Sequence, residues 1–171
     1  ARNPVTHGGR LQQLGTPQEG HRRPASRVVA DFMGLINLLP ATVIGKESGR
    51  DRLRTATGWT TVADVPATAV PGQRVEVAVR PENVRLLPHT GAALEHQDQG
   101  HQAATVTECT FLGSIMEYHV TLEDGAVLRV QTHPSEQFAV GDKVAVRIDA
   151  SRCTVFEAPA PNAHGGQGVD A

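Results

Sequence analysis

An internal repeat constrains the fold of this chain more than any other feature. The eight residues from Gly72 to Val79 recur from Gly141 to Ile148, so the two copies are offset by the 69 residues that separate the two glycines. Self-similarity at a fixed offset marks two copies of one supersecondary unit. Further positions match at the same offset or in a looser register: Val84, Leu86 and Leu87 fall on Cys153, Val155 and Phe156, and 41–43 falls on 104–106.

The repeated segments carry the pattern of a β-strand. Apolar residues alternate at Val75, Val77 and Val79 in the first copy and at the equivalent positions of the second. Because successive side chains of a strand point to opposite faces, this alternation places the apolar set on one face of a half-buried strand. The same reasoning predicts further short strands over 39–45, 53–56, 59–63, 84–87, 116–122 and 126–132. The expected fold class is all-β, a duplicated small domain rather than a fold built around one deep catalytic site.

Composition narrows the classes of partner. The 171 residues carry 16 Lys plus Arg against 18 Asp plus Glu, a net charge of −2, and only 4% aromatic residues. Binding to nucleic acid needs a basic surface, and binding to single strands needs aromatic stacking platforms, so no nucleic-acid partner is expected. The two cysteines are too few for a disulfide scaffold. Cys153 occupies the position of Val84 in the repeat and is expected to be a small core residue.

The first 36 residues differ from the rest and predict two short helices. Thr16 and Glu19 form a capping-box pattern, with Pro17 in the first helical turn. Ser26 stands where it can cap a second helix, which Gly34 would end. These helices are expected to precede the β-domain.

The expected organisation has three parts. Residues 1–36 form the N-terminal segment, 37–157 form the duplicated β-domain, and 158–171, rich in Ala, Pro and Gly, form a disordered tail. A copy of roughly 50–60 residues is near the size at which a core becomes marginal, so the two copies are expected to share one. The copies and the polar linker between them cover 37–88, 103–157 and 89–102.

Several motifs taken together resemble one family. The residues from Gly9 to Pro17, followed by 22–25 and 29–34, resemble the end of the nucleotide-binding domain of bacterial ABC importer ATPases. The stretch from Val77 to Leu86 resembles the C-terminal TOBE domain of the same proteins, a duplicated OB-like barrel of the TOBE/MOP-like type. Two further matches to that domain lie at 111–120 and 138–144. The resemblance covers about residues 8–157 and is strongest with the polyamine and ferric-iron branch.

The resemblance implies a function for the chain. It would be the C-terminal regulatory and dimerisation domain of the ATP-binding subunit of an ABC importer for polyamine-type solutes, preceded by a remnant of the ATPase domain. Its partners would be the permease subunits and a second ATPase subunit, with formation of a homodimer as a further expectation. The complete parent would use ATP and Mg²⁺ at the cytoplasmic face of the cell membrane. The apolar stretch 28–45 is too interrupted to span a bilayer.

The sequence also departs from the complete ATPase. It contains no Gly-rich phosphate-binding loop ending in Gly-Lys-Ser/Thr, no Leu-Ser-Gly-Gly-Gln-type signature and no apolar strand ending in Asp-Glu. This chain alone is therefore not expected to be an enzyme, and no catalytic or cofactor-binding residue is assigned. The alternative hypothesis is a standalone module that binds a small ligand such as an anion.

Five residues are candidates for a regulatory or interface role: Arg80, Glu82, Asn37, Phe111 and Gly113. Arg80 and Glu82 flank a proline that cannot donate to a β-ladder, so the structural interpretation is a strand-breaking turn with an ion pair or a cap. Asn37 stands where molybdate-binding relatives carry a Ser-Ala-Arg-Asn element. Because the Ser and Arg donors are missing, binding of molybdate or tungstate is not expected. Phe111 and Gly113 belong to the second family motif.

Other chemistry-bearing residues favour structural roles. His89, His96 and His101 match no closed zinc pattern and fit a solvated linker, so no metal site is expected. Ser114, His119 and Asp124 lie along one predicted hairpin and lack the strand-to-helix turn that supports a nucleophile. Arg50, Arg52 and Arg54 are expected to line the solvent face of a strand.

Overall fold

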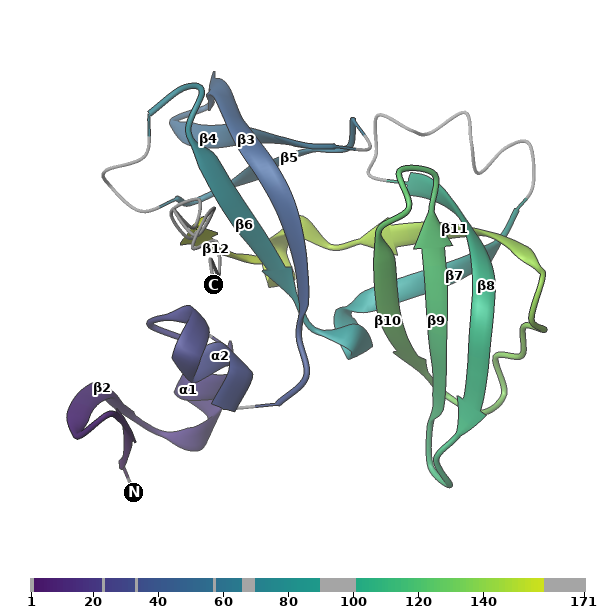
Figure 1. The fold of residues 1–171 in the computed structure, drawn as a ribbon, viewed down its shortest axis with the longest axis horizontal. Helices are drawn as coiled ribbons and strands as arrows, with labels where there is room; N and C mark the ends of the chain where they lie inside the picture. The colour runs from purple at the N-terminus through teal and green to yellow at the C-terminus, as the bar shows by residue number, and fades with distance from the viewer. Residues whose placement is uncertain are drawn as a thin grey trace, which may run out of the picture.

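A computed structural model describes residues 2–22, 24–32, 34–56, 58–65, 70–89 and 101–158, and it is built mainly from β-strands (Figure 1). The all-β prediction is therefore confirmed. Residues 90–100 of the predicted linker and 159–171 of the predicted tail lie outside the described residues. Strand β8 (His101–Phe111) begins inside the linker range that the sequence predicted.

The N-terminal segment contains a β-hairpin and two short helices. Strands β1 (Asn3–His7) and β2 (Arg10–Gly15) pair antiparallel, and helices α1 (Pro17–Arg22) and α2 (Arg27–Phe32) follow. The predicted capping box is present: the backbone N–H of Thr16 donates to Glu19 Oε2 over 2.7 Å, and the N–H of Glu19 donates to Thr16 Oγ1 over 3.2 Å. Ser26 Oγ accepts from the N–H of Val29, which confirms the second cap. The hairpin was not predicted from the sequence.

Two five-stranded antiparallel sheets form the rest of the fold. The first has the order β12-β6-β3-β4-β5 and the second has the order β7-β11-β8-β9-β10. The strands of the first sheet are β12 (Thr154–Glu157), β6 (Arg74–Val79), β3 (Asn37–Glu47), β4 (Arg50–Thr55) and β5 (Thr60–Ala63). Besides β8, the strands of the second sheet are β7 (Val84–Pro88), β11 (Lys143–Ile148), β9 (Met116–Leu122) and β10 (Val127–Thr132).

The two sheets exchange their last strands. After β6, the 3-10 turn η1 (Pro81–Asn83) leads into β7, which pairs with β11 in the other sheet. After β11, the 3-10 turn η3 (Ala150–Arg152) leads into β12, which returns to pair with β6. Figure 1 shows the two crossings running between the sheets in opposite directions. Equivalent strands of the two copies thus occupy equivalent places, and each copy completes the sheet of the other.

The repeat also extends to the turns. The N–H of Gly72 donates to the carbonyl of Val43, and the N–H of Gly141 donates to the carbonyl of Val106, both over 2.8 Å. Both glycines have a left-handed φ, +88° and +95°, which a side chain disfavours. The strand partners slip in register directly after Val43 and directly after Val106, as a β-bulge does. The looser sequence match between 41–43 and 104–106 therefore corresponds to equivalent structural positions in the two copies.

One hydrophobic core serves both sheets, as the size of each copy predicts. Its members come from both copies and include the buried side chains of Leu53, Val77, Tyr118 and Val146. Cys153 packs against this core from the position that Val84 fills in the first copy, so its predicted role is confirmed. Within the described residues, no helix is long and apolar enough to cross a bilayer.

Candidate functional site

Three of the five candidate residues lie together where the N-terminal segment meets the β-domain. Arg80 directly precedes η1, Glu82 lies within it, and Asn37 begins β3 opposite Val79 of β6. This region, which we call the joint, includes the 34–36 connection between α2 and β3. The strand break at Pro81 brings all three residues to the same end of the first sheet.

Arg80 is buried in the joint. Its side chain is 6% exposed, and Nη1 donates to the backbone carbonyl of Leu35 over 3.3 Å. Burial lowers the pKa of the Arg80 guanidinium below its ordinary value, and the negative charge of Glu82 opposes that shift. Burial of a charge is costly unless it is compensated, and here a carbonyl and a carboxylate compensate it. Arg80 therefore ties the connection that follows α2 to the end of β6.

Asn37 reaches from the first sheet to the edge of the second. Its Nδ2 donates to the carbonyl of Arg129, and the N–H of Arg129 donates back to Asn37 Oδ1, both over 2.8 Å. Arg129 lies on β10, an edge strand whose outer backbone groups would otherwise need water or another partner. The Asn37 amide, 7% exposed, thus replaces one peptide group of a missing neighbour strand. This contact joins the start of β3 to the second sheet.

A surface ion pair adds a further tie between α2 and the first sheet. Arg27 Nη1 lies 3.1 and 3.0 Å from the two carboxylate oxygens of Glu76 on β6. The Arg27 side chain is 46% exposed, so this pair contributes no more than about 1 kcal/mol. The ion pair therefore orients α2 relative to β6 more than it stabilises the fold.

A cleft of about 1360 Å³ separates the N-terminal segment from the β-domain. It is lined by Leu14, Thr16 and Glu19 on one side and by Arg80, Glu82 and Cys153 on the other, among other residues. Burial raises the pKa of the Cys153 thiol to about 12, with a smaller contribution from Asp149, so it is protonated and unreactive at neutral pH. The charges that line the cleft are mixed in sign, which suits a protein surface better than a small ion.

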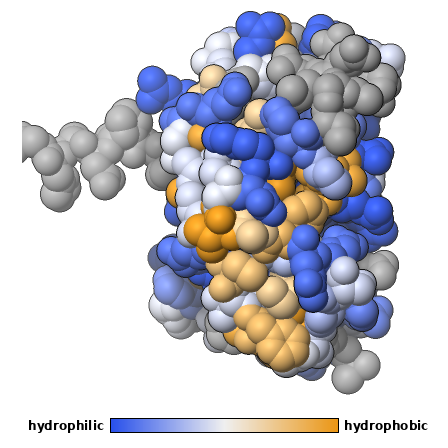
Figure 2. Space-filling model, turned by 90° about the vertical axis from the view of Figure 1, so that its right-hand side faces the viewer, coloured by the Kyte–Doolittle hydropathy of each residue, from blue (hydrophilic) through white to orange (hydrophobic). Residues whose placement is uncertain are grey.

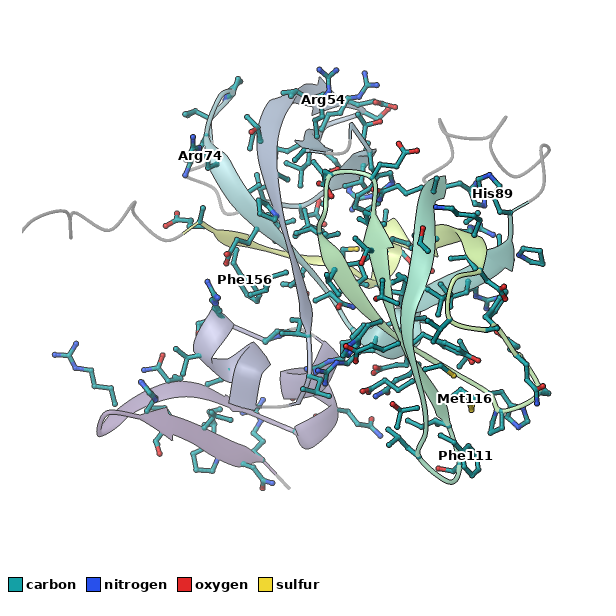
Figure 3. All side chains as sticks on the ribbon, turned by 45° about the vertical axis from the view of Figure 1, so that its right-hand side comes forward. Arg54, Arg74, His89, Phe111, Met116 and Phe156 are labelled. Carbon is teal, nitrogen blue, oxygen red and sulfur yellow. The ribbon has the colours of Figure 1, made fainter. Side chains whose placement is uncertain are left out.

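The other two candidates lie far from the joint, at the end of the β8–β9 hairpin. Phe111 ends β8, and Gly113 takes the left-handed φ of +87° in the turn closed by the Leu112 N–H and the Ile115 carbonyl. Phe111 and Leu112 are 62% and 51% exposed. Figure 3 places Phe111 and Met116 at this hairpin end, on the far side of the molecule from β12. Figure 2, which views the molecule from the right-hand side of Figure 1, shows apolar side chains gathered toward the lower end of the face that it draws. We call Phe111, Leu112 and Gly113 the hairpin tip.

The partners of the candidate residues were missed by sequence reasoning. Arg129 contributes its backbone, which carries no residue-type signal, and Leu35 likewise contributes a carbonyl. The Arg27–Glu76 pair joins residues 49 positions apart, so no local sequence pattern predicts it. Arg80 was selected because it flanks Pro81 and Asn37 because of its place in a family element, and neither reason predicted the joint.

The histidines and arginines singled out in the sequence have surface or ladder positions wherever the structure describes them. His119 Nδ1 lies 2.8 Å from Glu108 Oε2, across the β8–β9 ladder. Among the described residues, no group of three or more His, Cys, Asp and Glu side chains is placed to hold a metal ion. His96, Glu95 and Asp98 lie outside the described residues. Arg50, Arg52 and Arg54 are exposed on β4, as expected.

Comparison with known proteins gives one family and several relatives. Residues 77–156 match the model of the TOBE domain. The chain is 38% identical over 146 residues to the spermidine/putrescine import ATP-binding protein PotA of Ruegeria pomeroyi, covering 83% of this chain and 37% of that protein. A PotA from Rubrobacter xylanophilus is 36% identical over 89% of this chain and 40% of its own length.

A further relative has a different named solute. The Fe(3+) ions import ATP-binding protein FbpC of Brucella suis is 31% identical, covering 84% of this chain and 38% of that protein. The chain therefore spans about two fifths of the length of these relatives.

Among solved structures, the fold is similar to that of the cytoplasmic molybdate-binding protein ModG with molybdate bound. The TM-score is 0.59 at 16% sequence identity, and the match covers 71% of this chain and 96% of ModG. Identity at this level shows a shared fold and no more. The predicted TOBE/MOP-like barrel is thereby confirmed.

Proposed function

The chain carries a TOBE domain of the kind found in the ATP-binding proteins of ABC importers, and from this premise we propose that it is the C-terminal regulatory domain of such a protein. In the complete parent it would transmit the state of the ATPase domain, through the joint, to the β-domain. The parent would drive uptake of a solute at the cytoplasmic face of the membrane. The solute we propose is a polyamine, since relatives named for spermidine and putrescine share up to 38% identity with this chain.

The observation that carries this proposal is the double attachment of the joint. Arg80 holds the connection after α2 to the first sheet, while Asn37 holds the start of β3 to the second. A displacement of the N-terminal segment therefore acts on both halves of the β-domain at once. Coupling between distant sites is carried by chains of packed side chains and hydrogen bonds, and the contacts of Arg80 and Asn37 supply such a connection.

The complete parent would bring further partners. ATP and Mg²⁺ would be held by the ATPase portion, and the permease subunits would contact the same portion. The residues of this chain assigned to the joint contribute one buried guanidinium already bound to a carbonyl, which does not fit a phosphate-binding role. We therefore assign no step of ATP hydrolysis to the residues of this chain.

The hairpin tip is our proposed contact to a second ATPase subunit of the same kind. Phe111 and Leu112 present exposed apolar side chains at the end of a two-stranded projection, away from the joint. Apolar side chains gathered on an exposed projection favour association, because burial contributes about 25 cal/mol per Å². A change of Leu112→Ser should shift a dimer of the parent toward monomer, measured by light scattering, whereas Val127→Ser, an equally exposed control on β10, should not.

The proposal as a whole is tested by sequencing the gene upstream of the Ala1 codon. An in-frame region encoding a phosphate-binding loop, a signature motif and an Asp-Glu strand is the expected result. A stop codon directly upstream would contradict it. Uptake of labelled spermidine and of ferric ion by cells carrying the complete gene then distinguishes the two named classes of solute.

A further inference from the structure

The connection between α2 and β3 contains a backbone conformation that glycine alone adopts readily. Gly34 lies between the end of α2 and the start of β3, and its φ is +122°. A glycine that ends a helix in the usual way takes a left-handed φ near +57°, so a helix stop does not account for this value. Figure 1 shows the N-terminal segment beside the first sheet, joined to β3 through this connection.

Backbone freedom, and not lack of space, is what requires a glycine here. A Cβ atom built on Gly34 would lie 3.6 Å from Arg80 Nη1, which is an ordinary van der Waals contact. Gly34 is itself exposed, so packing does not fix its conformation. Hinges are a few residues at the ends of elements that absorb changes of φ and ψ, and an exposed glycine of this kind has the properties of one.

The chain directly after Gly34 is bound to the β-domain. Arg80 Nη1 donates to the carbonyl of Leu35 over 3.3 Å, and the Arg80 side chain is buried. Ile36 packs against a small hydrophobic cluster that contains Ala78 of β6. Because these contacts hold the chain from Leu35 onward, a change in orientation of the N-terminal segment is confined to Gly34 and the residues before it.

A surface ion pair holds the chain before Gly34. Arg27 Nη1 on α2 lies 3.0 Å from Glu76 Oε2 on β6, and the two side chains are 46% and 14% exposed. A pair this exposed changes a population ratio by no more than about fivefold, the equivalent of about 1 kcal/mol. The N–H of Ala25 donates to Gln13 Oε1 over 2.8 Å, which ties the region before α2 to β2. The cleft of about 1360 Å³ beside the segment leaves room for it to turn.

We propose that Gly34 is a hinge at which the N-terminal segment turns relative to the β-domain, and that the Arg27–Glu76 pair is the latch of the orientation described here. Arg80 is a positioning residue, because it fixes Leu35 and so places the turning point at Gly34. In the complete parent the hinge would set the direction of the ATPase portion, and this role rests on the proposed function. The hinge and the latch themselves belong to this chain and are tested in it.

The test is a distance measurement across the hinge by pulsed electron paramagnetic resonance. One nitroxide label is attached to Cys109, which is exposed on β8, and the other to Leu11→Cys, a position of β2 that is 60% exposed. Cys153 should stay unlabelled, because burial raises its pKa to about 12. The unmodified 171-residue chain should show two distances, and the main one should match the latched orientation.

Two variants and two matched controls separate the latch from the hinge. Glu76→Gln should lower the ratio of latched to unlatched molecules by up to about fivefold. Glu47→Gln breaks the Arg52–Glu47 surface pair, which lies outside the joint, and should leave the ratio unchanged. Gly34→Ala should lower the ratio at least about tenfold, because L-residues rarely adopt its φ. Gly49→Ala changes a glycine with a φ of +82° in the β3–β4 turn and should have no effect.

Salt and unfolding give independent readouts. Raising the ionic strength from 0.1 to 1 M should lower the ratio in the unmodified chain and not in Glu76→Gln, because the Debye length falls from about 10 to 3 Å. The fluorescence of Trp59, the only tryptophan of the chain, should report unfolding of Glu76→Gln at nearly the same urea concentration as that of the unmodified chain. Retention of the latched distance in Gly34→Ala, or equal ratios in Glu76→Gln and Glu47→Gln, would overturn the proposal whatever the gene encodes upstream.

Discussion

The two crossings between the sheets occupy equivalent positions of the repeat and are stabilised in different ways. Arg80 and Asp149 each precede a 3-10 turn, and Val84 and Cys153 each follow one, donating a backbone N–H to the first residue of the turn. Asp149 caps its own turn by accepting from the N–H of Ser151. Arg80 makes no such cap and instead reaches the carbonyl of Leu35, 45 residues earlier.

The first crossing is also more deeply buried than the second. Pro81 is buried in η1, which lies against β10, whereas η3 has no buried residue. The second crossing is therefore stabilised locally, and the first depends on the N-terminal segment and on the second sheet. The two copies therefore share one backbone conformation at the crossing, and only the first crossing makes a side-chain contact with the N-terminal segment.

The largest expected effect comes from removing the long-range contact of the first crossing. Arg80→Ala should lower the free energy of unfolding by about 3 kcal/mol, because a buried guanidinium, its packing and the partner of the Leu35 carbonyl are lost together. Urea denaturation measures the change. Arg54→Ala removes an exposed arginine and should stay within about 0.5 kcal/mol of the unmodified chain. Equal losses in the two variants would remove the distinction between the crossings.

The contact of Asn37 should rank second. Asn37→Ala should cost about 2 kcal/mol, since the N–H and carbonyl of Arg129 both lose a partner at a partly buried edge. Asn37→Asp keeps an acceptor for the N–H but places a nearly buried carboxylate against the carbonyl of Arg129, so it should not recover the loss at neutral pH. Urea denaturation of both variants provides the comparison, and an aspartate variant as stable as the unmodified chain would argue against this geometry.

The cap of the second crossing should contribute less. Asp149→Ala should cost about 1 kcal/mol, as loss of an N-cap side chain commonly does. The pKa of Asp149 is lower in the folded state than in the unfolded state, so its contribution is full above the ordinary aspartate pKa. The contribution is lost as the pH falls through the lowered value. The stability difference between variant and unmodified chain should therefore shrink in acid, and a constant difference down to low pH would contradict the assignment.

The smallest effect should come from making the two crossings alike at their last position. Cys153→Val introduces the residue that Val84 provides in the first copy, and urea denaturation should show a change of less than about 1 kcal/mol in the unfolding free energy.

The two cysteines should differ in reactivity. The folded protein should react with a thiol reagent at Cys109, which is exposed, well before Cys153, whose pKa is raised to about 12. Mass spectrometry after brief alkylation separates the two sites, and equal labelling would show that Cys153 is not held against the core.

The repeat and the strands were predictable because their signals are local. Alternation at Val75, Val77 and Val79 places β6 correctly, and Thr16 with Glu19 places the start of α1, since both patterns act within a few residues. The exchange of β7 and β12 between sheets was not predictable from the repeat, because a strand pattern does not name its partner. The N-terminal hairpin was missed because Leu11 and Leu14 are exposed and show no clean alternation.

The candidate site was predictable only in part. Arg80 and Asn37 stand at strand ends, where a side chain is free to leave the ladder, but their partners are backbone groups of Leu35 and Arg129. Backbone partners at separations of 45 and 92 residues depend on tertiary packing and leave no trace in residue type. Phe111 became a candidate only through a family motif, and its exposed position at the end of the β8–β9 hairpin was not predicted.

Amide hydrogen exchange at Arg129 tests the central claim, that the first crossing region binds the N-terminal joint to both sheets. Arg129 should exchange slowly in the unmodified chain and in Asp149→Ala, and quickly in Asn37→Ala. The amides of Leu128 and Val130 are internal controls, because alternate residues of β10 direct their N–H groups toward β9. Selective loss of protection at Arg129 is the predicted result. Unchanged protection in Asn37→Ala, or equal loss at all three amides, would contradict the account.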